Sequence, residues 1–256
     1  MLINNCLFVV PSPLEQFEII ALIPLNIMGF NFSLTNSSFF LIIASLILVF
    51  WISLSFHSAA LVPNNWQLMK EFIYSITSNM VRDNIGKKGE FYFPFIFSLH
   101  LILLYCNLIG MIPYSFTVTS HIIFTFGLAL AIFIGINIIG VQTHGFKFFA
   151  LFLPRGVPIG IIPLLVTIEF LSYIVKVFTL SIRLFANMTS GHTLLKIIAG
   201  FSWTLLSAGG VLAVLHLIPL GLLLALIGLE LAIAGLQAYV FTLLTCIYLN
   251  DVLDMH

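Results

Sequence analysis

Polar and ionisable side chains interrupt two long apolar segments in the C-terminal half of the chain, 164–199 and 220–249. The ones that could do chemistry there are Glu169, Lys176, Arg183, His192, Glu230 and Gln237. An ionisable side chain at bilayer depth costs at least about 2.5–3.5 kcal/mol, so an apolar chain should keep few without a use. Residues seven positions apart share a helix face, which predicts one polar stripe on each segment.

These residue types suit proton transfer. Glutamate and histidine can both bind and release protons when their surroundings tune them. Arginine stays protonated in proteins, so in a proton path Arg183 would block proton hopping and attract a passing carboxylate. One alternative is an ion pair between Glu230 and Arg183 that only holds two helices together. For Lys176, the alternative is a side chain that reaches out to lipid headgroups.

Composition places the chain in a membrane. Of its 256 residues 61% are hydrophobic and 7% charged, whereas soluble domains carry roughly 25% charged residues. Positive and negative residues balance, so nothing indicates nucleic-acid binding, and no glycine-rich phosphate loop indicates nucleotide binding. The three cysteines lie far apart without metal or disulfide spacing. We therefore expect no catalytic residues, cofactor or metal, and we expect a chain that is not itself an enzyme.

The elements that must position these residues are helices. A crossing needs about 20 apolar residues, and segments 39–56, 91–112 and 121–141 meet that length. Segment 64–82 has apolar residues at 3- and 4-residue steps among charged ones, which predicts an amphipathic helix on the membrane surface. The predicted fold class is an all-α polytopic membrane protein, with 1–256 as a single membrane domain.

The last two segments, 159–199 and 215–249, are expected to form a helical hairpin. The run 164–199 contains no proline and would make roughly 54 Å of helix, although only about 30 Å is needed to cross. Either both helices are strongly tilted, as in a hairpin wrapped against a curved partner, or each contains a break.

Basic residues predict the orientation. Lys70, Arg82, Lys87 and Lys88 follow the first crossing, and Lys147 and Arg155 follow the third. By the positive-inside rule these loops face the matrix or cytoplasm. Five crossings then place the N-terminus outside and the C-terminus inside.

Several motifs resemble the subunit a family of F-type ATP synthases, in its mitochondrial branch. They are Ser181-Ile-Arg-Leu-Phe-Ala-Asn-Met188 with Ser190-Gly-His192, the segment from Leu229 to Thr242, Ser12-Pro-Leu-Glu-Gln-Phe-Glu18, Gly110-Met-Ile-Pro-Tyr-Ser115 and Gly156-Val-Pro158. Some members lose a short leader before the Ser12 motif; because this chain begins with Met1, no cleavage is expected.

The resemblance implies a proton-translocating stator subunit with two offset half-channels. Arg183 matches the arginine that faces the carboxylates of a rotating ring of c subunits, and Asn187 and Gln237 match polar residues near it. His192 and Glu230 match the inlet pair. Glu169 matches the acid of the matrix-side half-channel, and Asp251 is expected to join that path.

The resemblance also implies partners and place. The expected partners are the c-ring, peripheral-stalk and other membrane-sector subunits, protons and the lipid bilayer, with no nucleic acid. The expected location is the mitochondrial inner membrane, with the N-terminus in the intermembrane space and the C-terminus in the matrix. The alternatives from the residues alone are a secondary transporter, a respiratory-chain membrane subunit and a structural scaffold. No internal repeat supports a transporter.

Overall fold

The computed structural model of the chain describes residues 12–27, 30–53, 63–112, 115–145, 148 and 159–253. Some expectations lie outside these residues. They are the leader before Ser12, residues 54–56 of the first predicted crossing, the basic loop with Lys147 and Arg155, the motif at 156–158 and the tail at 254–256.

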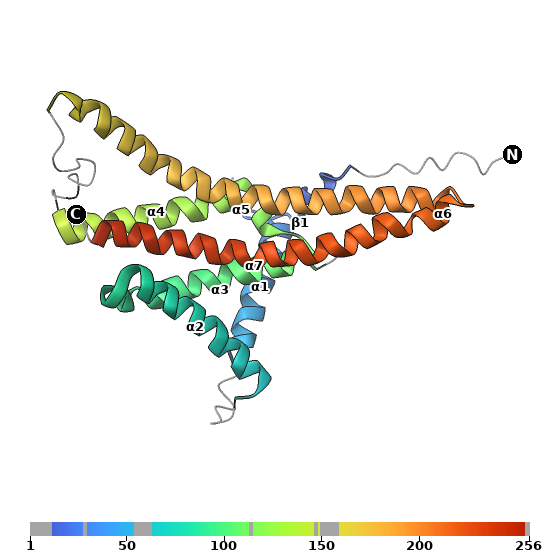
Figure 1. Cartoon of the computed structure of the whole chain (residues 1–256), viewed down its shortest axis with the longest axis horizontal. Helices are drawn as coiled ribbons and strands as arrows, with labels where there is room; N and C mark the ends of the chain where they lie inside the picture. Colours follow the sequence, from blue (N-terminus) through green and yellow to red (C-terminus); the bar gives the residue numbers. More distant parts are fainter. Residues whose placement is uncertain are drawn as a thin grey trace.

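Seven α-helices make up most of the described chain (Figure 1). They are α1 (Asn36–Ser53), α2 (Asn65–Ile85), α3 (Phe93–Gly110), α4 (Ile122–His144), α5 (Ile162–Ser207), the short α6 (Leu212–Leu215) and α7 (Leu217–Leu253). Among the described residues α1, α3, α4, α5 and α7 are long and apolar enough to cross a membrane. The expected crossings at 39–56, 91–112 and 121–141 overlap α1, α3 and α4, and the expected surface helix overlaps α2.

A short N-terminal region precedes α1 and contains the only strands among the described residues, which the sequence did not predict. It consists of the 3-10 turn η1 (Glu15–Phe17) and the strands β1 (Ala21–Ile23), β2 (Asn26–Ile27), β3 (Phe30–Asn31) and β4 (Leu34–Thr35). β1 pairs with β4 and β2 with β3, both antiparallel. The Asn36 amide fastens this region to α1, donating to the Glu18 carbonyl at 2.9 Å and accepting from the Ile20 amide at 3.3 Å.

Helix α2 is held against the end of α1 by one lysine. Lys70 Nζ donates to the Ile52 carbonyl at 2.6 Å and lies 5.0 Å from the centroid of the Trp51 ring. Burial in this contact lowers the pKa of Lys70. Asn64 begins α2 by accepting a hydrogen bond from the Asn65 amide, and Gly86 follows its last residue.

Helices α5 and α7 form the hairpin and are uninterrupted over 46 and 37 residues. Such helices are about 69 and 55 Å long, well beyond the thickness of a hydrocarbon core. The sequence left two explanations for the excess length, a tilt or a break in each segment. Because both helices are continuous, neither segment contains a break. Gly209 and Gly210 make the turn after α5 with φ of 70° and 61°, which glycine adopts without strain. The N-terminal part of α5 diverges from α7 (Figure 1).

The core lies around α7, which packs against α3, α5, α2 and α4. Leu103, Leu184 and Val252 are essentially inaccessible there. Elsewhere large apolar side chains face outward, for example Ile123 at 83% and Leu224 at 67% exposure. An apolar exterior of this extent is suited to lipid or to partner helices rather than to water.

Candidate functional site

Two side chains predicted as an inlet pair meet across the hairpin. His192 Nε2 on α5 lies 3.7 Å from Glu230 Oε1 on α7, and both side chains are largely buried. Within the described chain, neither carboxylate oxygen of Glu230 has a hydrogen-bond partner. Buried polar atoms are nearly always paired, so these oxygens have unused capacity for a water or a proton.

The local backbone explains why these two side chains approach so closely. A Cβ on Gly191 would lie 2.6 Å from Glu230 Oε1, so any larger residue would force the carboxylate out of its present position. Thr117 Oγ1, which precedes the 3-10 turn η4 (Val118–Ser120), lies 3.1 Å from His192 Nε2. The ring of Phe17 meets the His192 ring edge-on, with centroids 6.4 Å apart.

A cavity of about 230 Å³ adjoins the pair between α5 and α7. Its lining includes Glu230, Asn187 and Ser190, and is otherwise mostly leucine, isoleucine and methionine. Asn187 and Glu230 therefore line the same cavity, in which a few polar groups lie among apolar side chains. This volume is large enough for several waters.

Arg183 lies apart from the acid–histidine pair. It is exposed on α5, and within the described chain no hydrogen bond or ion pair reaches its guanidinium. The acid at Glu230 is next to His192 instead, so the structural ion pair between Glu230 and Arg183 does not form. Asn187 follows Arg183 by one helical turn and shares its face.

Gln237 is buried on α7, at 7% exposure. From the His192–Glu230 contact, Arg183 lies about 13.5 Å along α5 and Gln237 about 10.5 Å along α7 in the same direction, because the two helices are antiparallel. The hairpin thus places Gln237 near the level of Arg183.

A second ionic contact lies nearer the other end of the hairpin. Lys176 Nζ is 3.7 Å from Asp251 Oδ2, and it also lies over the rings of Tyr173 and Tyr248 at 5.8 and 5.1 Å. The sequence did not predict this pairing for either residue. Glu169 is exposed on the part of α5 that diverges from α7, and the structure does not bring it to the other predicted residues.

Three polar residues near the site carried no prediction of a role. Asn107 on α3 donates to the Ala234 carbonyl at 3.2 Å, while its own Oδ1 has no partner in the described chain. Thr117 contacts His192 as described above. Thr242 on α7 lies 3.2 Å from His100 Nδ1 in the core. Asn107 and His100 are seven residues apart, and that spacing was the available signal for a third polar face.

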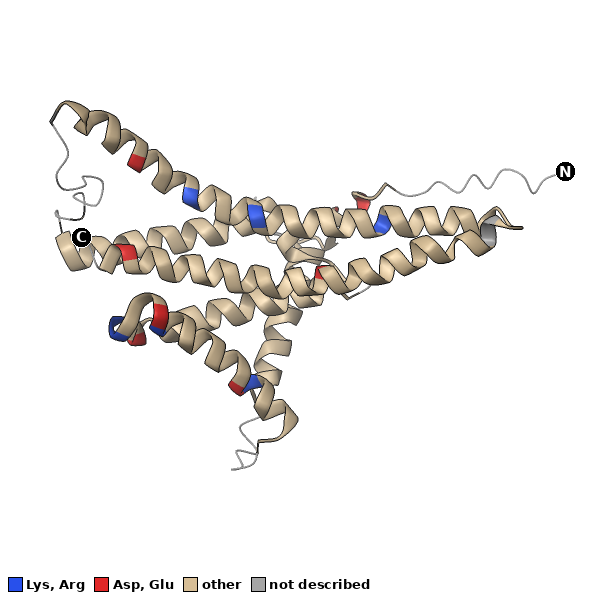
Figure 2. Ribbon diagram, in the orientation of Figure 1, with Lys and Arg blue, Asp and Glu red and all other residues tan. Residues whose placement is uncertain are grey.

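No group of three or more histidine, cysteine, aspartate or glutamate side chains within the described ranges could hold a metal ion. Charged residues are sparse along α5 and α7 and gather at the end of α2 (Figure 2). Fold and site together define a polytopic helical membrane protein with a few ionisable groups along a long hairpin.

Comparison with known proteins identifies the family. Residues 38–250 match the family described as ATP synthase A chain, and the chain belongs to this family, the proton-translocating membrane-sector subunit of F-type ATP synthase. It is 82% identical to "ATP synthase subunit a" of Chondrus crispus over 249 residues, covering 97% of this chain and 98% of that protein.

Plant relatives are similar over nearly the same length of this chain. "ATP synthase subunit a" of Marchantia polymorpha is 51% identical over 249 residues, covering 96% of this chain and 99% of the relative. "ATP synthase subunit a-2" of Arabidopsis thaliana is 48% identical over 255 residues, covering 96% of this chain and 73% of the relative. These matches leave no support for a secondary transporter or a respiratory-chain subunit.

Proposed function

We propose that this chain conducts protons to and from the carboxylates of a rotating c-ring through two offset half-channels, with Arg183 between them. The observation that carries the proposal is the separation of two chemistries within one hairpin. A buried acid–histidine pair, whose carboxylate accepts no hydrogen bond in the described chain, lies beside a cavity. Arg183, which is exposed and has no ion pair or hydrogen bond among the described residues, lies further along α5.

On the inlet side, a proton reaches His192 and Glu230 and passes through the adjoining cavity to a ring carboxylate. Thr117 orients the imidazole, and Asn187 supplies an amide to the same cavity. The neutralised ring carboxylate can then leave the arginine and enter the apolar membrane, because a neutral acid costs far less to desolvate than a charged one.

On the outlet side, a ring carboxylate that returns to Arg183 releases its proton, because a fixed cation favours the ionised acid. Glu169 and Asp251 receive that proton on the matrix side. Lys176 lies beside Asp251, which supports a positioning role for this lysine. Gln237, near the level of Arg183, lies between the two paths.

The proposed setting is the mitochondrial inner membrane, with the N-terminus in the intermembrane space and the C-terminus in the matrix. The charged end of α2 supports this orientation by the positive-inside rule. The chain does no phosphoryl chemistry itself; its proton flow drives rotation, and ATP forms in partner subunits. Uninterrupted helices longer than a bilayer support a tilted hairpin against the ring.

The test compares wild type with Arg183→Ala in vesicles that contain the whole complex. An imposed proton gradient drives ATP synthesis, and passive proton leak through the membrane sector is recorded on the same vesicles. Arg183→Ala should abolish synthesis while leak persists or rises. The matched control is Thr179→Val, one turn earlier on the same face, whose hydroxyl bonds only to its own helix at the Lys176 carbonyl.

Synthesis near the wild-type rate in Arg183→Ala would overturn the proposed divider. Loss of both synthesis and leak would overturn it as well, because it would make the arginine part of the conducting path. Assembly of each variant complex is checked first on a native gel.

A further inference from the structure

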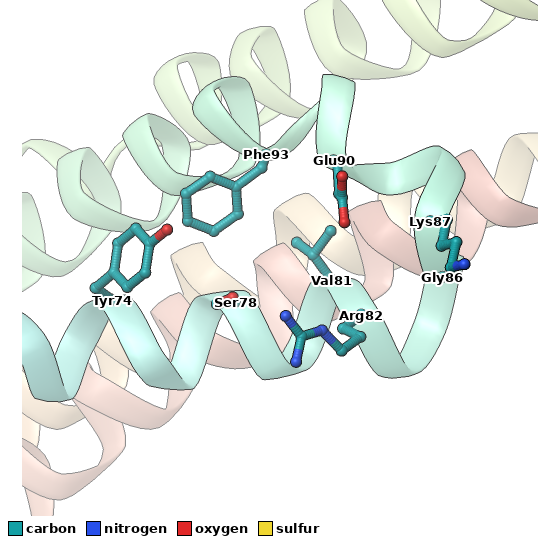
Figure 3. Close-up of a pocket in the computed structure, with 8 residues that line it drawn as sticks. All are labelled: Tyr74, Ser78, Val81, Arg82, Gly86, Lys87, Glu90 and Phe93. Carbon is teal, nitrogen blue, oxygen red and sulfur yellow. The ribbon is translucent and has the colours of Figure 1, made fainter.

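A pocket of about 560 Å³ lies at the junction of α2 and α3, and no residue of the hairpin lines it. The 3-10 segment η3 (Gly86–Phe91) leads from α2 back toward the start of α3. Its Gly89 allows a close return, since a Cβ there would lie 2.8 Å from Val81 Cγ1. Figure 3 shows that side chains from α2, η3 and the first residue of α3 line the pocket.

Three charged side chains line this pocket. Arg82 on α2 and Lys87 on η3 are cations, and Glu90 extends from η3 toward α2 (Figure 3). Within the described chain, no ion pair joins Arg82 to Glu90. The lining therefore carries one net positive charge, and a guanidinium that can bind both oxygens of a phosphate is available.

The pocket lies beside the first residue of a candidate membrane span, where lipid headgroups are expected. It ends at Phe93, the first residue of α3, which is a candidate membrane span. Tyr74 packs edge-on against Phe93, with ring centroids 5.1 Å apart, and supplies a hydroxyl at the same place. Phe91, which follows the lining residue Glu90, is 84% exposed, so apolar surface adjoins the charged pocket. A free anion would make no favourable contact with that apolar surface, whereas acyl chains would bury it.

We propose that this pocket binds the phosphodiester headgroup of an anionic membrane phospholipid, held by Arg82 and Lys87, with its acyl chains along Phe91 and the first turn of α3. Ser78 and Tyr74 offer hydroxyls to the phosphate oxygens. Glu90 repels the phosphate and so lowers the affinity of the pocket for the headgroup.

The experiment uses the whole complex in phosphatidylcholine vesicles that carry a small share of phosphatidylglycerol with a photoreactive acyl chain. After illumination, mass spectrometry measures the cross-link yield on the peptide that spans residues 72–97. Arg82→Gln with Lys87→Gln should lower the yield about a hundredfold, since each lost charged hydrogen bond weakens binding about tenfold. Glu90→Gln should raise it about threefold by removing a nearby like charge.

The matched control is Lys88→Gln, which removes a neighbouring cation that does not line the pocket and should change the yield by about twofold or less. Unlabelled phosphatidylglycerol should compete, and inorganic phosphate should not. Equal loss in Lys88→Gln, an unchanged yield in the double variant, or a fall in Glu90→Gln would overturn the proposal. Competition by inorganic phosphate would also overturn it, by assigning the pocket to a free anion.

Discussion

At the scale of single residues, the Glu230 oxygens, which accept no hydrogen bond within the described chain, are the strongest support for the proposed function. A buried carboxyl group that served only to join two helices would be expected to have its oxygens paired, because an unsatisfied buried group destabilises the fold. Glu230 instead lies beside one histidine and a cavity, with neither oxygen bonded within the described chain. This arrangement suits a group that binds and releases a proton during turnover.

Gly191 should be essential to the acid–histidine pair. In Gly191→Ala the added methyl group would lie 2.6 Å from Glu230 Oε1, so the carboxylate must shift from its present position beside His192. We expect proton-driven ATP synthesis to fall about tenfold, because small displacements at a reacting group have large effects. Gly127→Ala on α4, where a Cβ meets nothing within 4 Å, is the control and should keep the wild-type rate. Equal rates in both variants would refute the close-approach argument.

Substitutions at two neighbouring threonines distinguish an effect on the orientation of His192 from an effect on packing. Thr117→Val removes the contact to His192 Nε2 at 3.1 Å together with the hydroxyl's 3.3 Å bond to the Gly110 carbonyl. We expect ATP synthesis to fall about fivefold, the equivalent of the one bond that reaches His192. Thr119→Val removes a buried hydroxyl that has no partner in the described chain, so it should leave synthesis unchanged. Rates are measured in vesicles at one imposed gradient. The same loss in both variants would show that Thr117 acts through packing alone.

At the scale of elements, the N-terminal region forms a strap that lies against α5. Lys196 Nζ on α5 donates to the Ser12 carbonyl at 3.2 Å, and Phe17 then reaches the His192 ring. At its other end Asn36 fastens the strap to α1. The strap therefore covers one side of the proposed inlet.

Lys196→Met should loosen this strap without unfolding the hairpin. One charged hydrogen bond is lost, so hydrogen exchange of the amides in residues 14–20 should become about tenfold faster. Exchange in α5 itself should not change. Thr193→Ala, whose hydroxyl bonds only within its own helix to the Ser190 carbonyl, serves as the control. Unaltered exchange in Lys196→Met would mean that other contacts hold the strap.

At the scale of the whole molecule, the proposed orientation can be tested by labelling from either side. The native Cys106 and Cys246 are buried, and replacing Cys6 by serine removes the third thiol. In that background, Ser12→Cys should react with a membrane-impermeant maleimide in mitoplasts, and Asp83→Cys only in inverted inner-membrane vesicles. The positive-inside rule requires this result. Labelling of both positions from one side, or the reverse pattern, would refute the orientation.

Sequence alone determined the class of protein and the residues of the hairpin. Hydropathy needs no tertiary information, because every segment that crosses lipid must satisfy its own backbone as a helix. The charged residues in α5 and α7 could also be recognised from the sequence, because an ionisable side chain inside a membrane segment costs free energy. Arg183, His192 and Glu230 could therefore be named before any fold was known.

Only the tertiary structure decided which of these residues meet. Helical spacing gives the face of a residue on its own helix, but the register between two helices depends on packing along their whole length. That register put Glu230 beside His192 rather than Arg183, and joined Lys176 to Asp251. The strap and the contact of Thr117 with His192 were invisible for the same reason, since both join residues far apart in the chain.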